Sequence, residues 1–235
     1  KTLDYRAYSF LFIVSMFVAI VPAYNEEKRI GSVVQSLFEH VDKVIVVDDA
    51  SVDNTSEDGR KAGAVVLNHK INLGQGAALE TGHEYARKIN ADYVLHFDGD
   101  GQFHVEDVIP AFESLKKEKA DILFGSRFLD NRSNMPWFKR YILSPIGHLV
   151  NIIFGAVRLT DVHNGFRILN KRALNKIIIS QDRMAHATEI LALTKKHNLK
   201  YIEFPVKVTY HEYGQSATGG FKIVRDLLWG KVVRK

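Results

Sequence analysis

Residues 93–102 read YVLHFDGDGQ, and this stretch decides the fold class of the chain. It begins as a short run rich in apolar and aromatic residues, which is typical of a strand buried in a sheet. Two carboxylates, Asp98 and Asp100, follow directly, with a glycine between them. Because ligands of parallel α/β sheets bind beyond the carboxyl ends of the strands, this acidic pair predicts a sheet of that class with a site at its edge.

The same pattern repeats on both sides of this stretch. Short runs that indicate buried strands lie at residues 17–21, 44–47, 64–67 and 122–124. Apolar residues between them recur with helical spacing, as in Ile30, Val33 and Leu37. Since strand and helix alternate to about residue 125, we expect an α/β fold with a mostly parallel sheet flanked by helices.

After that point the pattern is less regular. Residues 137–157 form a long apolar stretch that Pro145 and Gly147 interrupt. A polar segment at 161–167 comes next, then a helix around 188–197, a strand at 201–208 and a terminal helix from about Phe221.

The composition is that of a globular protein. The 235 residues are 46% hydrophobic and 25% charged, which excludes a disordered chain or a collagen-like repeat. The length suits one large domain, or one domain with a short appendage. Cysteine is absent, so a disulfide scaffold, a thiolate zinc site and a cysteine nucleophile are excluded, and a cytoplasmic location is expected.

The formal charge of +5 is unevenly distributed. Residues 126–160 carry a net charge of +4 and the last 25 residues +3, which leaves −2 for the remainder. Two basic stretches on a slightly acidic body indicate an anionic partner at one surface, and a solvated basic surface remains the alternative. Because no nucleic-acid recognition motif accompanies the charge, we expect phosphate or anionic lipid rather than nucleic acid.

No apolar run reaches the length of about 20 residues that a membrane-spanning helix needs. The longest candidate, residues 10–22, suits a core strand with a hydrophobic lead-in, or a segment at a membrane interface. Cleavage of this run as a signal peptide would remove the first strand of the sheet, so we expect it to be retained.

Each polar motif has a chemical interpretation and a structural one. Asp98 and Asp100 offer hard oxygen ligands for Mg²⁺ or Mn²⁺, with Gln102 as a further contact, although an acidic pair around glycine can also be a solvated turn. Asp49 can accept hydrogen bonds from a base or ribose, while the neighbouring Ser51 or Asp53 can cap a helix.

Two further motifs follow the same logic. Gly76 belongs to a glycine loop that opens a helix, which is typical of an anion site or of a plain turn. Arg127 follows a strand, where its guanidinium can bind phosphate or form a surface ion pair.

Taken together and in order, these motifs resemble those of the family 2 glycosyltransferases of GT-A fold, a Rossmann-like α/β architecture. They are residues 19–26 (AIVPAYNE), 47–55 (VDDASVDNT), 72–76 (NLGQG), 98–102 (DGDGQ), 125–127 (GSR) and 164–167 (NGFR). The resemblance is closest to the branch of dolichyl-phosphate mannose synthases and polyprenyl-phosphate glycosyltransferases. It covers residues 17–216 as one catalytic domain, with a hydrophobic lead-in at 1–16 and an amphipathic helix at 217–235.

The resemblance implies a role for each motif. The nucleotide's base and ribose would be held by Pro22, Tyr24, Glu26 and Asp49, and the glycine loop with Gly76 would lie at the substrate. The divalent metal on the diphosphate would be held by Asp98, Asp100 and Gln102. The acceptor phosphate would face Arg127 and Arg140, and a C-terminal loop with His211, Gln215 and Ser216 would stand where mannose synthases carry basic phosphate contacts.

Two departures from the mannose synthase pattern favour a UDP-sugar as donor, with GDP-mannose as the alternative. They are that C-terminal loop and Gln75, which occupies a place where relatives often have lysine. The resemblance also implies inversion at the anomeric carbon. A lipid phosphate is already mostly an oxyanion at neutral pH and needs orientation, whereas a sugar hydroxyl needs a general base. Asp161 is the first candidate for that base and Glu189 the second; structurally, Asp161 could instead pair with Arg158 or Arg167, and Glu189 could be a helix charge.

We therefore expect a metal-dependent glycosyltransferase that acts on a polyprenyl or dolichyl phosphate, peripheral on the cytoplasmic face of the membrane. Basic and apolar residues share the predicted helix at 217–235, which indicates a membrane-docking helix or an ordinary core helix. Two other functions stay open: a transferase that extends a saccharide hydroxyl, and a non-catalytic nucleotide-sugar-binding module at the membrane. No oligomeric state is predicted.

Overall fold

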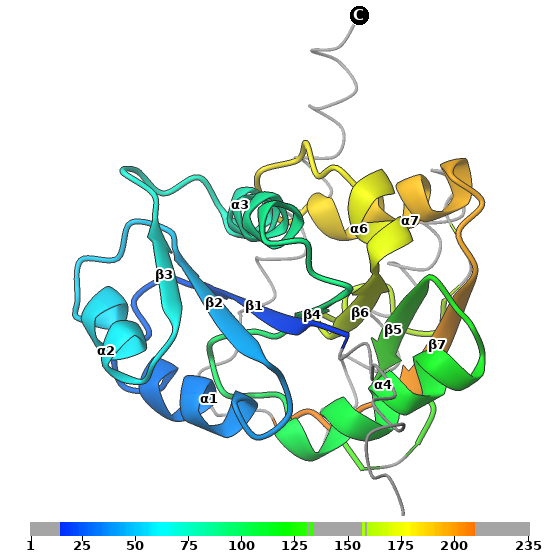
Figure 1. The fold of residues 1–235 in the computed structure, drawn as a ribbon, viewed down its shortest axis with the longest axis horizontal. Coiled ribbons are helices and arrows are strands. Elements are labelled where there is room, and N and C mark those ends of the chain that lie inside the picture. Colours follow the sequence, from blue (N-terminus) through cyan, green and yellow to red (C-terminus); the bar gives the residue numbers. More distant parts are fainter. Residues whose placement is uncertain (1–14, 131, 134–156, 158, 210–235) are drawn as a thin grey trace, which may run out of the picture.

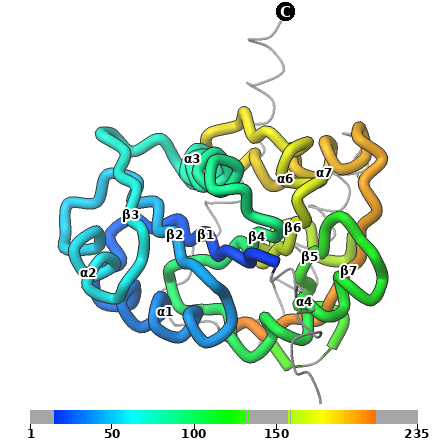
Figure 2. Tube along the Cα trace, in the orientation of Figure 1, coloured from blue at the N-terminus to red at the C-terminus, as the bar shows by residue number. Residues whose placement is uncertain are grey.

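A computed structural model describes residues 15–130, 132, 133, 157 and 159–209 (Figures 1 and 2). Seven strands form one sheet in the order β3-β2-β1-β4-β6-β5-β7. The strands are β1 (Phe17–Ala23), β2 (Lys43–Asp48), β3 (Val65–Asn68), β4 (Tyr93–His96), β5 (Ile122–Ser126), β6 (Arg167–Asn170) and β7 (Tyr201–Pro205). The helices are α1 (Ile30–Leu37), α2 (Thr55–Lys61), α3 (Gln75–Lys88), the 3₁₀ turn η1 (Val105–Asp107), α4 (Val108–Lys117), α6 (Lys171–Lys176) and α7 (His186–Lys196).

The sheet confirms the predicted α/β class. Strands β1 to β4 pair in parallel, and so do β5 and β7. The exception is β6, which lies between β4 and β5 and is antiparallel to both. Neither β6 nor α6 was expected, because the four residues of β6 begin with Arg167 and end with Asn170 and carry no clear apolar run.

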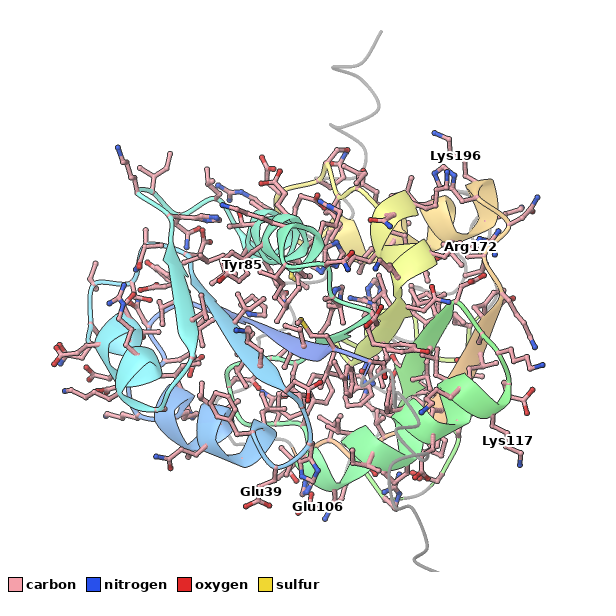
Figure 3. The ribbon with its side chains drawn as sticks, viewed as in Figure 1. Glu39, Tyr85, Glu106, Lys117, Arg172 and Lys196 are labelled. Atoms are coloured by element: carbon pink, nitrogen blue, oxygen red, sulfur yellow. The ribbon has the colours of Figure 1, made fainter. Side chains whose placement is uncertain are left out.

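Two hydrophobic cores, one on each face of the sheet, follow from the alternation of side chains along the strands. In β1, Ala19 and Val21 pack with α1 and α4, whereas Val18 and Ile20 pack with α3, α6 and α7. Figure 1 shows the two helical layers above and below the sheet. Charged side chains such as Lys117 and Lys196 extend outward from these helices (Figure 3).

Several expectations lie outside the described residues. They are most of the lead-in at 1–16, the apolar and basic segment at 137–156, and the amphipathic helix at 217–235. Within the part of the chain that the structure describes, no helix combines the length and apolar character needed to cross a bilayer.

Candidate active site

The loops that follow β1, β2 and β4 meet at one edge of the sheet, because these strands are parallel neighbours. Backbone and side-chain hydrogen bonds join the first two loops. The N–H of Asn25 donates to Ser51 Oγ at 2.9 Å, and the N–H of Glu26 donates to Thr55 Oγ1 at 2.7 Å. We call this edge, formed by residues 22–27, 48–55 and 98–102, the donor edge, after the role that the resemblance predicts for it.

Neither of the two predicted residues caps α2. The N-cap position is Asn54, whose side chain makes no cap hydrogen bond. The Asp53 carboxylate accepts from the N–H of Thr55 at 3.0 Å in a turn at the start of the helix, and the Ser51 hydroxyl accepts from the β1 loop.

The predicted nucleotide ligands lie on this edge. Tyr24 is 48% exposed directly after β1. Burial raises the pKa of Glu26 above its usual value, an effect that Arg29 opposes and the negative charge of Asp100 reinforces. A Cβ at Gly99 would lie 3.2 Å from the carbonyl oxygen of Pro22, so the acidic loop packs directly on the β1 loop. The structure thus brings the predicted nucleotide and metal residues together.

Asp49 is also at this edge, but its carboxylate already has partners. One oxygen is 2.7 Å from His69 Nδ1 and accepts from the N–H of Leu73 at 2.8 Å. The other accepts from the N–H of Gly74 at 2.7 Å. Asp49 therefore anchors the loop between β3 and α3, and contact with the nucleotide stays a prediction.

The acidic pair lies beyond the end of β4 and has the chemistry of a cation site. Asp98 Oδ1 accepts from Gln75 Nε2 at 2.8 Å, and Asp100 Oδ1 accepts from the N–H of Gln102 at 3.0 Å. Burial and the negative charge of Asp100 raise the pKa of the Asp98 carboxyl to about 7, against the opposing effect of Arg167. Because two neighbouring carboxylates repel each other, a cation bound between them stabilises the pair.

The described residues offer no larger ligand set around the pair. Among the described residues, no group of three or more His, Cys, Asp or Glu side chains could hold a metal ion. Mg²⁺ is commonly bound by one or two carboxylates together with substrate phosphates rather than by a complete protein cage. Asp98 and Asp100 fit a divalent ion of that kind.

The space around Gly76 is more crowded than expected for a glycine that binds substrate. A Cβ at Gly76 would lie 1.9 Å from the carbonyl oxygen of Gln181, and one at Gly74 would lie 2.6 Å from that of Asp182. The same Asp182 oxygen accepts from the N–H of Ala77 at 3.1 Å. These glycines are needed because residues 181–182 pack directly against the start of α3, and this packing occupies the space beside Gly76.

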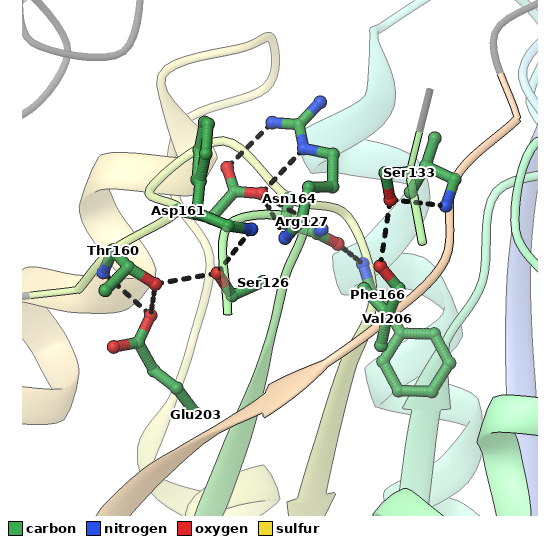
Figure 4. Close-up of polar contacts among 11 residues, drawn as sticks. Ser126, Arg127, Ser133, Thr160, Asp161, Asn164, Phe166, Glu203 and Val206 are labelled. Carbon is green, nitrogen blue, oxygen red and sulfur yellow. Dashed lines mark hydrogen bonds and ion pairs between the residues drawn. The ribbon is translucent and has the colours of Figure 1, made fainter. Parts of the chain in front are cut away.

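Arg127 and Asp161 form a bidentate ion pair at the end of β5 (Figure 4). Arg127 Nε donates to Asp161 Oδ2 at 2.6 Å, Nη2 donates to Oδ1 at 2.7 Å, and the Arg127 backbone N–H adds a bond of 3.0 Å. Burial alone would raise the pKa of Asp161, but the Arg127 guanidinium and the bonds to the carboxylate lower it below its usual value.

This pairing argues against the predicted role of Asp161 as a general base. A carboxylate with a lowered pKa and both oxygens on a guanidinium is a poor proton acceptor. Its hydrogen-bonded partner is Arg127, and the described contacts link Arg167 to it only through charge. Arg158, the other predicted partner, lies outside the described residues. Asn164, from the predicted NGFR motif, donates to Asp161 Oδ2 at 3.2 Å and so supports the pair.

Hydrogen bonds connect the residues around this pair to β7. Ser126 Oγ lies 2.6 Å from Thr160 Oγ1, and Thr160 donates to Glu203 of β7 (Figure 4). Further along, Arg132 Nη1 donates to Asp107 at 2.7 Å. We call the end of β5 with residues 126–130, 132, 133, 160 and 161 the acceptor edge, after the role that the resemblance predicts for Arg127.

Glu189 is likewise not placed as a base. It lies in the first turn of α7, where its carboxylate accepts from the N–H groups of Ser180 and Gln181 at 2.9 and 2.8 Å and from the Ser180 hydroxyl. These bonds argue against a role as base, and they hold residues 180–181 in place.

Arg167 is a site residue whose placement sequence reasoning missed. Its side chain is 2% exposed and lies between the two edges, because its electrostatic partners are Asp98 and Asp161. Burial lowers its pKa to about 10, against the effect of these two carboxylates. The NGFR motif marked its position, but only the pairing of β6 with His96 of β4 shows that the guanidinium is inside.

Four predicted substrate residues, Arg140, His211, Gln215 and Ser216, lie outside the described residues. The described chain ends at Thr209, whose N–H donates to the carbonyl oxygen of Gln102 at 3.0 Å. The C-terminal segment therefore returns to the donor edge at that point.

Comparison with known proteins identifies the family. The sequence model described as glycosyl transferase family 2 matches residues 18–178. The chain belongs to glycosyl transferase family 2. Membership makes it a glycosyltransferase, and it confirms the resemblance drawn from the six motifs.

Relatives within this family cover nearly the whole glycosyltransferase. It is 37% identical over 223 residues to the uncharacterized protein MJ1222 of Methanocaldococcus jannaschii, with 91% of each chain covered. It is 32% identical to the UDP-N-acetylglucosamine--dolichyl-phosphate N-acetylglucosaminyltransferase of Methanococcus voltae, covering 91% of this chain and 95% of that one. A dolichyl-phosphate beta-glucosyltransferase of Trichomonas vaginalis, ALG5D, is 29% identical, with 89% and 71% covered.

Solved structures agree on the fold. Glucosyl-3-phosphoglycerate synthase of Mycobacterium tuberculosis superposes with a TM-score of 0.71 at 19% identity, over 92% of this glycosyltransferase and 80% of that chain. A structure of the same synthase in complex with Mn²⁺, UDP and glucosyl-3-phosphoglycerate gives a TM-score of 0.70 at 17% identity, over 92% and 79%. At these identities the likeness shows the GT-A fold of the present chain.

Proposed function

We propose that this glycosyltransferase moves a sugar, with inversion and with the aid of Mg²⁺ or Mn²⁺, from a nucleotide diphosphate sugar to a polyprenyl or dolichyl phosphate. The observation that carries the proposal is the pairing of two sites around one buried guanidinium. The charge of Arg167 acts both on Asp98 of the acidic pair and on Asp161, which is ion-paired with Arg127. A cation site and an oriented arginine suit a reaction between two phosphate-bearing substrates.

At the donor edge, Asp98 and Asp100, with Gln102 beside them, would hold the metal. A divalent ion bound there would neutralise the charge that develops on the departing diphosphate. Pro22, Tyr24 and Glu26 would hold the nucleoside. A UDP-sugar is the preferred donor, which is supported by the name of the Methanococcus voltae relative and by the UDP complexes of the mycobacterial synthase; GDP-mannose is the alternative.

At the acceptor edge, Arg127 would orient the lipid phosphate, and Arg140 would assist. A phosphate monoester with a second pKa of about 6 is mostly ionised at pH 7, so it needs no base. A phosphate oxygen would attack the anomeric carbon as the bond from that carbon to the diphosphate breaks, and the nucleoside diphosphate leaves. Asp161 and Glu189, the two predicted bases, are both engaged in hydrogen bonds, which favours a phosphate acceptor over a saccharide hydroxyl.

The same acceptor implies a place of action. We propose that the protein works peripherally at the cytoplasmic face of a membrane, with its two basic stretches toward anionic lipid. The dolichyl phosphate in the names of two relatives supports this placement. The other expectation, a non-catalytic nucleotide-sugar-binding module, is set aside because the chain belongs to a family of glycosyltransferases.

The proposal is tested by incubating the purified protein with labelled UDP-sugars or GDP-mannose, Mn²⁺ or Mg²⁺, and polyprenyl phosphate. We expect label to enter the organic phase with at least one donor, and to stay out of it when EDTA replaces the metal. Free saccharides offered in parallel test the alternative acceptor. Absence of glycolipid with every donor would overturn the proposal, and transfer to a saccharide instead would establish the other enzyme function.

A further inference from the structure

We propose that Gln75 is a positioning residue that orients Asp98 for the divalent ion, an inference that rests on the proposed function. Gln75 is the first residue of α3, and Asp98 follows β4, so the bond joins two layers of the fold. Its amide Nε2 donates to Asp98 Oδ1 at 2.8 Å. Such hydrogen bonds to metal ligands fix the direction in which the ligand atoms point.

The second oxygen of Asp98 is confined as well. A Cβ built at Gly165 would lie 2.5 Å from Asp98 Oδ2, so that oxygen rests against the backbone of the NGFR segment. The carboxylate is therefore held on one side by an amide and on the other by a glycine. Together these contacts restrict how the carboxylate can turn.

The charge of the group that donates a hydrogen bond to Asp98 affects cation binding. An amide N–H satisfies a carboxylate lone pair and carries no net charge, whereas an ammonium would cancel the negative charge that attracts a cation. Gln75 can thus fix the carboxylate and keep its charge available. This distinguishes it from Arg167, which affects Asp98 through its positive charge.

Gln75 can act in this way because the start of α3 is itself fixed from two directions. On one side, the N–H of Gly74 donates to Asp49 Oδ2 at 2.7 Å. On the other, the N–H of Ala77 donates to the carbonyl oxygen of Asp182 at 3.1 Å, and Glu189 holds the residues just before it. The backbone from which the Gln75 side chain extends is therefore held in place without a ligand.

The test replaces Gln75 by methionine, which has a similar length and no N–H. Gln35→Met, at an exposed position of α1, is the matched control. Mn²⁺ affinity is measured in the presence of UDP from the electron paramagnetic resonance signal of free Mn²⁺, and thermal unfolding is followed in parallel. We expect Gln75→Met to weaken Mn²⁺ binding about tenfold, as partners of metal ligands commonly do, and Gln35→Met to leave it unchanged.

Kinetics give a second readout. The Mn²⁺ concentration for half-maximal rate should rise by about the same factor, while kcat at saturating Mn²⁺ stays close to that of the unmodified protein. If Gln75→Met does not fold, Gln75→Asn, whose amide is one methylene too short to reach, takes its place with the same expected result. Unchanged Mn²⁺ affinity in a folded variant would overturn the role of Gln75 alone. If the unmodified protein binds no Mn²⁺ with UDP, the proposed metal dependence fails, and the inference fails with it.

Discussion

The donor edge and the acceptor edge hold their charged groups in opposite ways. At the donor edge Asp98 is bonded by the Gln75 amide and Asp49 by two backbone N–H groups, and only Glu26 among these three carboxylates pairs with a guanidinium, that of Arg29. At the acceptor edge the charged groups are paired with each other, as Arg127 is with Asp161. The donor edge therefore keeps negative charge, while the acceptor edge keeps an oriented guanidinium.

This difference shows what each edge requires of its substrate. Negative charge gathered at the end of β4 favours a cation, and the cation in turn favours a diphosphate. A guanidinium fixed by a carboxylate loses little further freedom when it binds, so its contribution is mainly direction. The predictions below test the two edges separately, beginning with the largest effect.

Loss of a metal carboxylate should have the largest effect. Asp100→Asn keeps the size of the side chain and removes its charge, so kcat/KM should fall by about 10³-fold, near the upper limit for removal of one group that stabilises transition-state charge. Initial rates at saturating Mn²⁺ measure this, with circular dichroism as the control for folding. An Asp100→Asn protein with the full rate would remove Asp100 from the metal site.

The second largest effect should follow from disturbing the close packing of the glycine loop. Gly76→Ala would place a methyl group 1.9 Å from the Gln181 carbonyl oxygen, so unfolding free energy should fall by about 3 kcal/mol. Gly31→Ala in α1 is the control, because nothing lies within 4 Å of its Cβ. Urea denaturation of both variants checks the prediction. Equal stability of the two would contradict the packing role and reopen the phosphate-binding interpretation of Gly76.

Removal of the oriented arginine tests the acceptor edge. Arg127→Ala should lower kcat/KM for the lipid phosphate by about 10²-fold, because a charge-assisted bidentate contact is lost. Asp161→Asn should act in the same direction and less strongly, since Arg127 remains but is held less firmly. In both variants the KM for the nucleotide sugar should change little. A rise confined to the donor KM would place the pair at the donor edge instead.

The protonation of His186 should have the smallest effect of these four. Burial lowers the pKa of His186 to about 4, with the charge of Arg167 acting in the same direction. Because the folded state disfavours the protonated imidazole, stability is full above the ordinary pKa of about 6.5 and is lost as the pH falls toward 4. We expect about 2 kcal/mol less unfolding free energy from this group at pH 5 than at pH 7.

Urea denaturation at both pH values measures the loss, and His186→Asn should show a smaller difference between them. If the variant and the unmodified protein lose the same stability, His186 is not the group responsible.

How much could be predicted from the sequence differs between the two edges. The parallel half of the sheet was predictable because its strands are short apolar runs that alternate with helices, and a parallel sheet brings their ends together. Thus Tyr24, Glu26, Asp98 and Asp100 lie at one edge, as expected. Nothing local signalled β6, because its first residue is an arginine whose burial depends on pairing with β4 and β5.

Side-chain partners were harder to predict than positions. Asp161 was expected to pair with Arg158 or Arg167 or to act as a base, but its partner Arg127 lies 34 residues away in the sequence. Gly76 looks like part of an anion loop until residues 181–182, distant in sequence, are found against it. These contacts depend on tertiary packing, which spacing along the chain does not encode.

The most direct test of the central claim compares two lipids that differ only in charge. Labelled nucleotide sugar is offered with Mn²⁺ and either polyprenyl phosphate or the uncharged polyprenol of the same length, and organic-phase label is measured with and without EDTA. The account predicts a labelled lipid only from the phosphate, and only while the divalent ion is present. Equal labelling of polyprenol, or full labelling of the phosphate in EDTA, would contradict it.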